Sequence, residues 1–503
     1  MRDHQSVQRS TLTLAPSWVL AYREGDLTLL RDHEVTVEEG TIVAVRPRQR
    51  ATDAVELPGQ ILLPGFISAH SHASTGVATR GYVESNLTPL SKVPQLRERR
   101  QYLRAMELID DLPDEEVDDI TALNLAEMLR SGCTTQVEMS VSLKQMKSYV
   151  RVARRYRMRG YPSAGAPGMK RLLAIWKREG DHQLLFDSVP ETLSEIEANL
   201  DYARSINGVD NGRILPMMAA LTNVANTPET FLALRKAAEE LNGLHLHFQA
   251  GYGRRPFVDA DALNTLWGYD EVPWLESMGI FDEGVPVFGA HLLGVDFRRD
   301  LDILAAHPNF TFGNCPSGTG AGVSPAQWPW PEALAAGVNC GIGLDTHSND
   351  YVENMKLAVM YGRARADMLG DSTPVPMARP SIWNAIESAT LAPARGLGRS
   401  DIGRIEEGAK ADLTSIDVSG LLVGVGVTPL EPLNHLMYAN GLSVTNVMTD
   451  GYWQVRDRQL VVDDEATVLA RGGAVVQNLW AQMEAEGIFV DMPRSDLIPA
   501  SAT

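Results

Sequence analysis

The order of predicted secondary structure is the feature of this sequence that most constrains its fold. From about residue 63 to about residue 398, short apolar runs typical of strands alternate with longer amphipathic segments typical of helices. "DDITALNLAEMLRSG" followed by "CTTQVEMS" is one such pair, and "ETFLALRKAAEELNG" followed by "LHLHFQA" is another. This alternation indicates parallel strands with helices packed outside them.

Eight strand ends can be located in this stretch, the number that a closed (β/α)8 barrel requires. We place them near His72, Glu138, Ala164, Thr222, His247, His291, Asn314 and Asp345. Further strand-like runs come before and after the stretch, and we expect them to pair with one another. The predicted fold is an α/β (β/α)8 TIM barrel with a small composite β-sandwich domain from both chain ends.

This prediction divides the 503 residues into four parts. We assign residues 1–62 and 399–470 to the two parts of the β-sandwich, 63–398 to the barrel, and 471–503 to a C-terminal helix and tail. A chain of this length is too long for one ordinary core, so a barrel with an additional domain also fits its size.

Composition limits the partners that we expect. A net charge of -19 argues against binding to nucleic acid, whose phosphates would be repelled. Cys133, Cys315 and Cys340 are widely spaced and form no C-x-x-C pair, which is typical of a reducing cytoplasm. We see neither a secretion signal nor a run of 18 apolar residues. We therefore expect a cytoplasmic protein that acts on a small molecule and binds no membrane.

Two histidines follow an apolar run in "ILLPGFISAHSHAS", residues 61–74. Side chains alternate between the two faces of a strand, so His70 and His72 point the same way. Neutral histidine is a common zinc ligand, and such a pair is half of a metal site. A pair of exposed loop histidines is the alternative, and this stretch alone leaves it open.

Other strand ends carry residues of the same chemical kind. His245 and His247 share one face of the fifth strand, with His247 nearer its end, His291 ends the sixth strand and Asp345 the eighth. Each of these alone is more commonly a packed residue or a helix cap. Because the carboxyl ends of barrel strands converge on one face, their joint presence predicts a metal site with a base and a polarising group.

The segments that carry these residues resemble the amidohydrolase superfamily, in particular its chlorohydrolase and cyclic-amidine deaminase branch. "PGFISAHSH" is similar to its first-strand H-x-H, "TRGY" follows at the spacing of its R-G element, and "LAEMLRSGCTTQVEM" is similar to its second-strand segment. "PEALAAGVNCGIGLDTHSND" resembles its G-V-x-x-G-x-G-T-D-x-x-S-N segment, and "IGRIEEGAKADLTSID" its return to the β domain. The resemblance spans nearly the whole chain.

The resemblance implies particular roles. His70, His72, His247 and Asp345 would bind one divalent metal ion, usually zinc in that family, while His291 would polarise the substrate and Asp345 would also act as the base. Members with two metal ions use a carboxylated lysine on the fourth strand, but "ILPMMAALTN" contains no lysine, so we expect one ion. Barrels of this class often form homo-oligomers, and we expect the same of this chain.

The sequence also departs from the family pattern. The fifth-strand pattern H-x-x-E is here His247 followed by Phe248-Gln249-Ala250, without the carboxylate. The seventh-strand pattern H-x-P-x-S-N begins here with Asn314, and the glycine that usually follows the aspartate is replaced by Thr346. We expect the following residues to contact the substrate: Gln249, Asn314, His347 and Glu138. For Glu138, a contact with a helix is the commoner role.

The missing carboxylate bears on the reaction. Deamination of an aromatic ring requires a group that protonates the ring nitrogen, and an amide side chain such as that of Gln249 does not titrate in the useful range. We therefore predict a metal-dependent amidohydrolase that cleaves a C–N bond of an amide, urea or carbamate with an apolar or aromatic part. The alternative is a deaminase of a heterocycle, namely a purine, pyrimidine, pterin or triazine. A non-catalytic barrel scaffold is less favoured, because packing alone would not preserve the ligand set.

Overall fold

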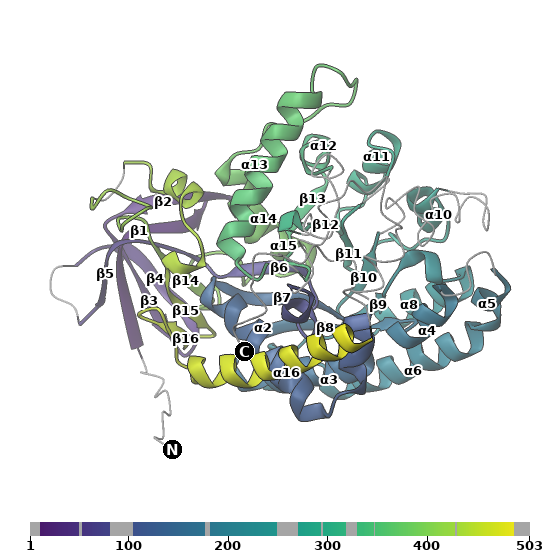
Figure 1. Ribbon diagram of the computed structural model, residues 1–503. Coiled ribbons are helices and arrows are strands. Elements are labelled where there is room, and N and C mark those ends of the chain that lie inside the picture. Colours follow the sequence, from purple (N-terminus) through teal and green to yellow (C-terminus); the bar gives the residue numbers. More distant parts are fainter. Residues whose placement is uncertain are drawn as a thin grey trace, which may run out of the picture.

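The structure is a computed structural model. It describes residues 11–49, 53–80, 104–176, 182–248, 270–292, 295–317, 329–346, 348–427 and 430–486. A parallel barrel surrounded by helices makes up most of the molecule, and a β domain lies at one side of it (Figure 1).

Eight strands form the barrel in the order β13-β12-β11-β10-β9-β8-β7-β6, and every neighbouring pair is parallel. The strands are β6 (Phe66–Ser71), β7 (Cys133–Ser140), β8 (Arg159–Ala166), β9 (Met218–Ala220), β10 (Leu244–His247), β11 (Val287–Ala290), β12 (Phe310–Asn314) and β13 (Asn339–Ile342). Each ends within about three residues of the position expected from the sequence. The predicted barrel is confirmed.

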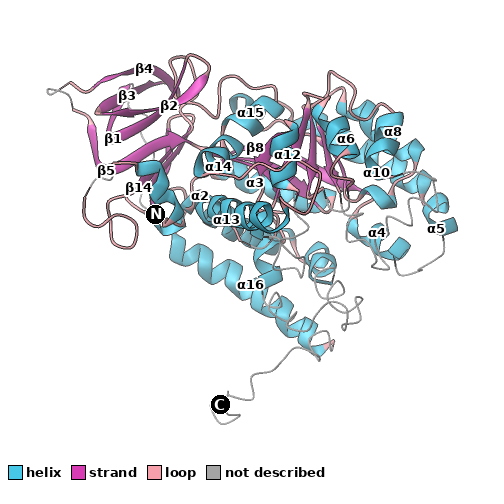
Figure 2. Cartoon of the chain, turned by 90° about the horizontal axis from the view of Figure 1, so that it is seen from above, coloured by secondary structure: helices cyan, strands magenta, loops and turns pink. Residues whose placement is uncertain are grey.

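Most of the helices lie around the barrel strands, as the view from above shows, whereas α16 (Glu465–Ala485) packs on the outer helix α2 (Asp114–Arg130) (Figure 2). They are α2 (Asp114–Arg130), α3 (Leu143–Arg155), α4 (Met169–Trp176), α5 (His182–Asp187), α6 (Val189–Ile206), α7 (Val209–Gly212), α8 (Pro228–Ala238), α10 (Glu271–Ser277), α11 (Arg299–Ala305), α12 (Trp330–Ala336), α13 (Tyr351–Leu369), α14 (Ile382–Ala389), α15 (Leu391–Gly396) and α16 (Glu465–Ala485). Short 3-10 turns cover Asn223–Ala225, Pro432–Met437 and Gly441–Ser443. Among the described residues, no helix is both long and apolar enough to cross a membrane.

Both ends of the chain contribute to one mixed nine-stranded sheet, as expected. Its strands are β1 (Thr11–Arg23), β2 (Asp26–Arg31), β3 (His33–Glu38), β4 (Thr41–Pro47), β5 (Val55–Pro64), β14 (Leu413–Asp417), β15 (Val444–Thr449), β16 (Tyr452–Arg456) and β17 (Gln459–Leu460). The antiparallel pairing of β14 with β5 joins the two parts. We keep the four-part division of the chain as a proposal, with β5 continuing to Pro64 and α16 beginning at Glu465.

Side chains fill the barrel below its mouth. Ile67, Val137, Tyr161, Met217 and Phe288 belong to one buried apolar cluster. Four of them lie on different barrel strands, and Met217 directly precedes a fifth. The barrel is therefore a packed core, and only its carboxyl end can hold a site.

The barrel closes between β6 and β13 at this carboxyl end. The carbonyl oxygen of His70 accepts hydrogen bonds from the backbone N–H of Leu344 at 2.8 Å and of Asp345 at 3.2 Å. The N–H of His72 donates in turn to the carbonyl oxygen of Asp345 at 3.3 Å. The closing backbone contacts thus belong to residues that were predicted to bind the metal.

A buried ion network joins the barrel to the β domain. Arg159 on β8 donates to Asp412 at 2.8 Å and to Asp450 at 2.7 Å, and its side chain is 1% exposed. Asp412 directly precedes β14, and Asp450 lies between β15 and β16. The guanidinium therefore links two carboxylates of the β domain to the barrel wall.

Replacing this arginine should strongly destabilise the protein. Arg159→Met leaves Asp412 buried without its cation and Asp450 with Arg213 alone, at 3.3 Å, which costs about 3–5 kcal/mol in the free energy of unfolding. Urea unfolding followed by circular dichroism measures the change. Arg151→Met is the matched control, because its pair with Asp118 is partly exposed and contributes at most about 1 kcal/mol. Equal effects of the two substitutions would contradict the prediction.

Candidate metal centre

Five side chains predicted from four strand ends come together at the barrel mouth. The potential ligand atoms of His70, His247 and His291 lie within 4.8 Å of one another, and so do those of His70, His72 and Asp345. None of these residues is more than 7% exposed. The convergence expected from the sequence is therefore present in the structure.

The backbone selects the tautomers of two of these histidines. Nδ1 of His72 lies 2.6 Å from the carbonyl oxygen of Met139, and Nδ1 of His247 lies 3.0 Å from that of Leu221. A carbonyl oxygen only accepts, so in the neutral rings both Nδ1 atoms carry the hydrogen. Each Nε2 then keeps its lone pair, which is the arrangement required for binding a metal through Nε2.

Two residues of the cluster have an unusual backbone conformation. His291 has a φ of 74° and Asp345 a φ of 55°, the left-handed region that residues other than glycine seldom adopt. Both are held there by backbone bonds to neighbouring strands, from His291 N–H to Gly313 at 3.0 Å and from Asp345 N–H to His70 at 3.2 Å. Such conformations cost free energy and are concentrated at functional sites.

Burial sets the protonation of the cluster. It lowers the pKa of His72 to about 4 and holds the pKa values of His70 and His247 well below the usual value, so all three rings are neutral at pH 7. Burial also raises the pKa of Asp345 to about 7. Its carboxylate oxygens lie 3.7 Å from Nε2 of His72 and 3.7 Å from Nε2 of His291, too far for hydrogen bonds.

These donors fit a divalent cation. In the described part of the chain, the buried Nε2 atoms of His70 and His72 have no hydrogen-bond partner. Unpaired buried nitrogens and a desolvated carboxyl group are costly without a cation. A metal ion would accept the lone pairs and restore the charged form of Asp345, and histidine with aspartate is a ligand set typical of zinc.

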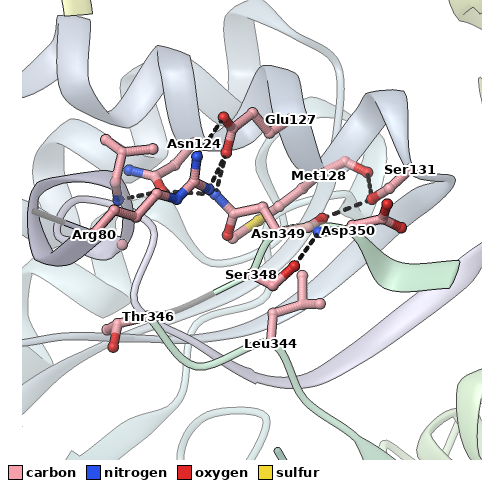
Figure 3. A network of polar contacts seen from close by, with 12 residues as sticks. Arg80, Asn124, Glu127, Met128, Ser131, Leu344, Thr346, Ser348, Asn349 and Asp350 are labelled. Atoms are coloured by element: carbon pink, nitrogen blue, oxygen red, sulfur yellow. Dashed lines mark hydrogen bonds and ion pairs between the residues drawn. The ribbon is translucent and has the colours of Figure 1, made fainter. Parts of the chain in front are cut away.

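A polar network holds the turn that follows Asp345 (Figure 3). Glu127 on α2 accepts hydrogen bonds from Arg80, at 2.8 and 2.5 Å, and from Asn349, at 2.8 Å. The carbonyl oxygen of Asn349 accepts from Ser131 at 2.7 Å. Arg80 of the R-G segment and Asn349 of the S-N segment thus donate hydrogen bonds to the same carboxylate. The sequence did not reveal this role of Glu127.

The structure does not bring Asn314 to the cluster. Gly313 faces the barrel interior, where an added Cβ would lie 3.5 Å from Cβ of His70. Because side chains alternate along a strand, the side chain of Asn314 faces outward. Asn314 accordingly lines a small cavity of about 10 Å³ with Trp330 and Gly362, between β12 and the helices α12 and α13.

Glu138 has partners of its own. Its carboxylate accepts hydrogen bonds from Ala73 N–H at 3.3 Å and from the Ser140 hydroxyl at 2.8 and 3.1 Å. Burial raises its pKa to about 8. These contacts place the group beside the turn that follows His72. Gln249 and His347, the other predicted substrate contacts, lie outside the described residues.

Comparison with known proteins extends these findings. A profile described as the amidohydrolase family matches residues 61–453. The chain is 26% identical over 445 residues to a 5-methylthioadenosine/S-adenosylhomocysteine deaminase of Desulfitobacterium hafniense, which covers 86% of this chain and 90% of the relative.

Two solved structures share the fold. An adenosine deaminase from Xanthomonas campestris with bound zinc has a TM-score of 0.72 and 22% identity, over 93% of this chain and 98% of that one. The atrazine chlorohydrolase of Arthrobacter aurescens complexed with zinc has a TM-score of 0.74 and 19% identity, over 92% of this chain and 100% of that one.

Proposed function

Because the chain belongs to the amidohydrolase family, we propose that it is a metal-dependent hydrolase that cleaves a C–N bond of a small molecule. The observation that carries this proposal is the buried cluster in which His70, His72 and Asp345 bring their ligand atoms within 4.8 Å of one another. Nothing in barrel packing requires neutral imidazoles beside a desolvated carboxyl group.

We assign His70, His72, His247 and Asp345 as ligands of one divalent ion, most favourably zinc. A divalent ion held there would lower the pKa of water from 15.7 to about 7 and so supply a nucleophile at neutral pH. The zinc in the two structures of similar fold supports the choice of metal.

Asp345 would transfer protons during the reaction, and His291 would stabilise the negative charge that develops on the substrate. Asp345, 3.7 Å from Nε2 of His72 and of His291, would accept a proton from the attacking water and return it to the departing nitrogen. His291, whose Nε2 lies 3.7 Å from Asp345, would donate a hydrogen bond to the substrate oxygen as negative charge develops on it. Burial keeps bulk water away from both groups and strengthens these interactions.

The leading substrate class is an amide, urea or carbamate with an apolar or aromatic part. Such a substrate needs only a polarised carbonyl group and a protonated leaving nitrogen, which the cluster can provide. Deamination of a heterocycle is the second candidate, favoured by the deaminase names of relatives that cover most of the chain. It would need a proton donor to the ring nitrogen in place of the missing fifth-strand glutamate.

A substrate panel separates the two candidates. Zinc-loaded protein is assayed at equal concentrations of aryl amides, ureas and carbamates for amine or acid release, and of purines, pyrimidines, pterins and triazines for ammonia release. Turnover of the first group supports the leading proposal. Efficient ammonia release with no activity on the first group would replace it with the second. The Asp345→Asn variant, prepared identically, controls for contaminating enzymes.

Loss of the predicted oxygen-binding histidine should slow the reaction without removing the metal. His291→Asn is expected to lower kcat about 10²- to 10³-fold, the usual cost of one such donor. Steady-state kinetics and elemental analysis of the same sample measure both properties. Loss of the metal in this variant would make His291 a ligand and would call the assignment of His247 into question.

We also propose that the protein is a cytoplasmic homo-oligomer. Sedimentation velocity and cell fractionation test the two parts of this proposal.

A further inference from the structure

His245 lies two residues before the proposed ligand His247 on β10 and has no place in the reaction described above. It is fully buried, and its Nε2 lies 2.9 Å from Nδ1 of His70. The two rings meet edge to face, with centroids 4.9 Å apart and an interplanar angle of 89°. The contact is a hydrogen bond between two neutral rings inside the barrel.

The Nδ1 partner of His70 is an imidazole nitrogen, whereas the Nδ1 partners of His72 and His247 are backbone carbonyl oxygens. His72 and His247 direct Nδ1 at backbone carbonyl oxygens, which can only accept. An imidazole nitrogen can donate or accept, so the pair of His70 and His245 has two neutral arrangements. The backbone therefore fixes the proton on two of the imidazole ligands and leaves it unfixed on the third.

The two arrangements have opposite consequences for the metal. In the first, His70 donates from Nδ1 to Nε2 of His245, and its own Nε2 keeps a lone pair. In the second, Nε2 of His245 donates to Nδ1 of His70, and the hydrogen of His70 sits on Nε2, where it blocks coordination. Because Nδ1 of His70 is occupied by His245, only Nε2 is left as a ligand atom.

We propose that His245 is a positioning residue of the metal site, which accepts the Nδ1 hydrogen of His70 and thereby keeps Nε2 of His70 available as a ligand. This inference rests on the proposed function, because it assumes a bound ion. In the metal-loaded protein the hydrogen of His245 is consequently on Nδ1, an atom for which the described residues offer no hydrogen-bond partner. Metal binding thus selects the tautomers of both rings together.

Zinc affinity tests the proposal without relying on turnover. Affinity is measured by competition with a chromophoric chelator for three variants: His245→Leu, His245→Gln and the control His435→Leu. His245→Leu should weaken binding about 10- to 100-fold, the typical cost of losing a partner of a ligand histidine. His245→Gln should stay within about threefold of wild type, because its amide oxygen can accept the same hydrogen. His435 bonds to Val423 away from the cluster, and its substitution should leave affinity unchanged.

The tautomers provide a second readout that needs no variant. In zinc-loaded wild-type protein labelled with ¹⁵N-histidine, long-range ¹⁵N–¹H spectra should show His245 protonated at Nδ1 and bare at Nε2, with His70 protonated at Nδ1. A hydrogen on Nε2 of His245 would overturn the inference, and so would full zinc affinity in His245→Leu. These outcomes leave the proposed function intact, whereas a wild-type protein that binds no zinc would overturn both.

Discussion

Substitution of Asp345 by asparagine should abolish turnover, with kcat at least about 10⁴-fold below that of the wild type. The carboxylate oxygens lie 3.7 Å from Nε2 of His72 and 3.7 Å from Nε2 of His291, which puts the proposed base beside both rings. Asparagine keeps the shape of the side chain but cannot accept a proton at neutral pH. It would also remove the one anionic group among the proposed ligands, while the three proposed histidine ligands remain.

The measurement combines kinetics with metal analysis. The variant should keep part of its metal and its fold while losing activity on every substrate that the wild type accepts. Asp371→Asn is a suitable control, because Asp371 is exposed beyond the end of α13 and should leave kcat unchanged. Activity close to that of the wild type in Asp345→Asn would reject Asp345 as the base.

Removal of the metal should have an effect of similar size. Dialysis against a strong chelator is expected to abolish turnover, because no titratable group of the cluster can ionise water at neutral pH without a cation. Addition of one equivalent of zinc per chain should restore it. Loading should also raise the melting temperature, since the ion binds the folded protein and satisfies the nitrogens of His70 and His72.

Stoichiometry decides between one ion and two. Elemental analysis of fully active protein should give about one divalent ion per chain, because the proposed ligands His70, His72, His247 and Asp345 satisfy one ion and "ILPMMAALTN" supplies no bridging lysine. Two tightly bound ions at full activity would contradict the mononuclear site. Full activity in metal-free protein would contradict the mechanism altogether.

The parts of the site that sequence predicted are those set by strand position. His72, His247 and His291 end or directly follow barrel strands, and Asp345 lies three residues beyond the end of β13. Parallel strands bring their carboxyl ends together whatever the rest of the chain does. The alternation of apolar strands and amphipathic helices carries this information directly, so the sequence alone predicts both the barrel and its mouth.

The parts that sequence did not predict depend on which face of a strand a residue occupies. A shift of one residue moves a side chain to the other face, and Gly313 rather than Asn314 faces the interior of the barrel. Contacts between segments that are distant in the sequence could not be predicted either. The bond from His70 to His245 and the ion network of Arg159 join residues whose separation in the sequence carries no periodic signal.

The closure of the barrel through His70 and Asp345 has a consequence for how the protein would acquire the proposed metal during synthesis. The first strand leaves the ribosome long before the last, so the nascent chain can present histidines from β6 and β10 while the position of Asp345 is still undefined. Contacts so far apart in the sequence form slowly, because a long loop must close before they gain any energy. The complete proposed donor set would therefore exist only after the barrel has closed, and tight zinc uptake by a refolding chain should follow barrel closure in time.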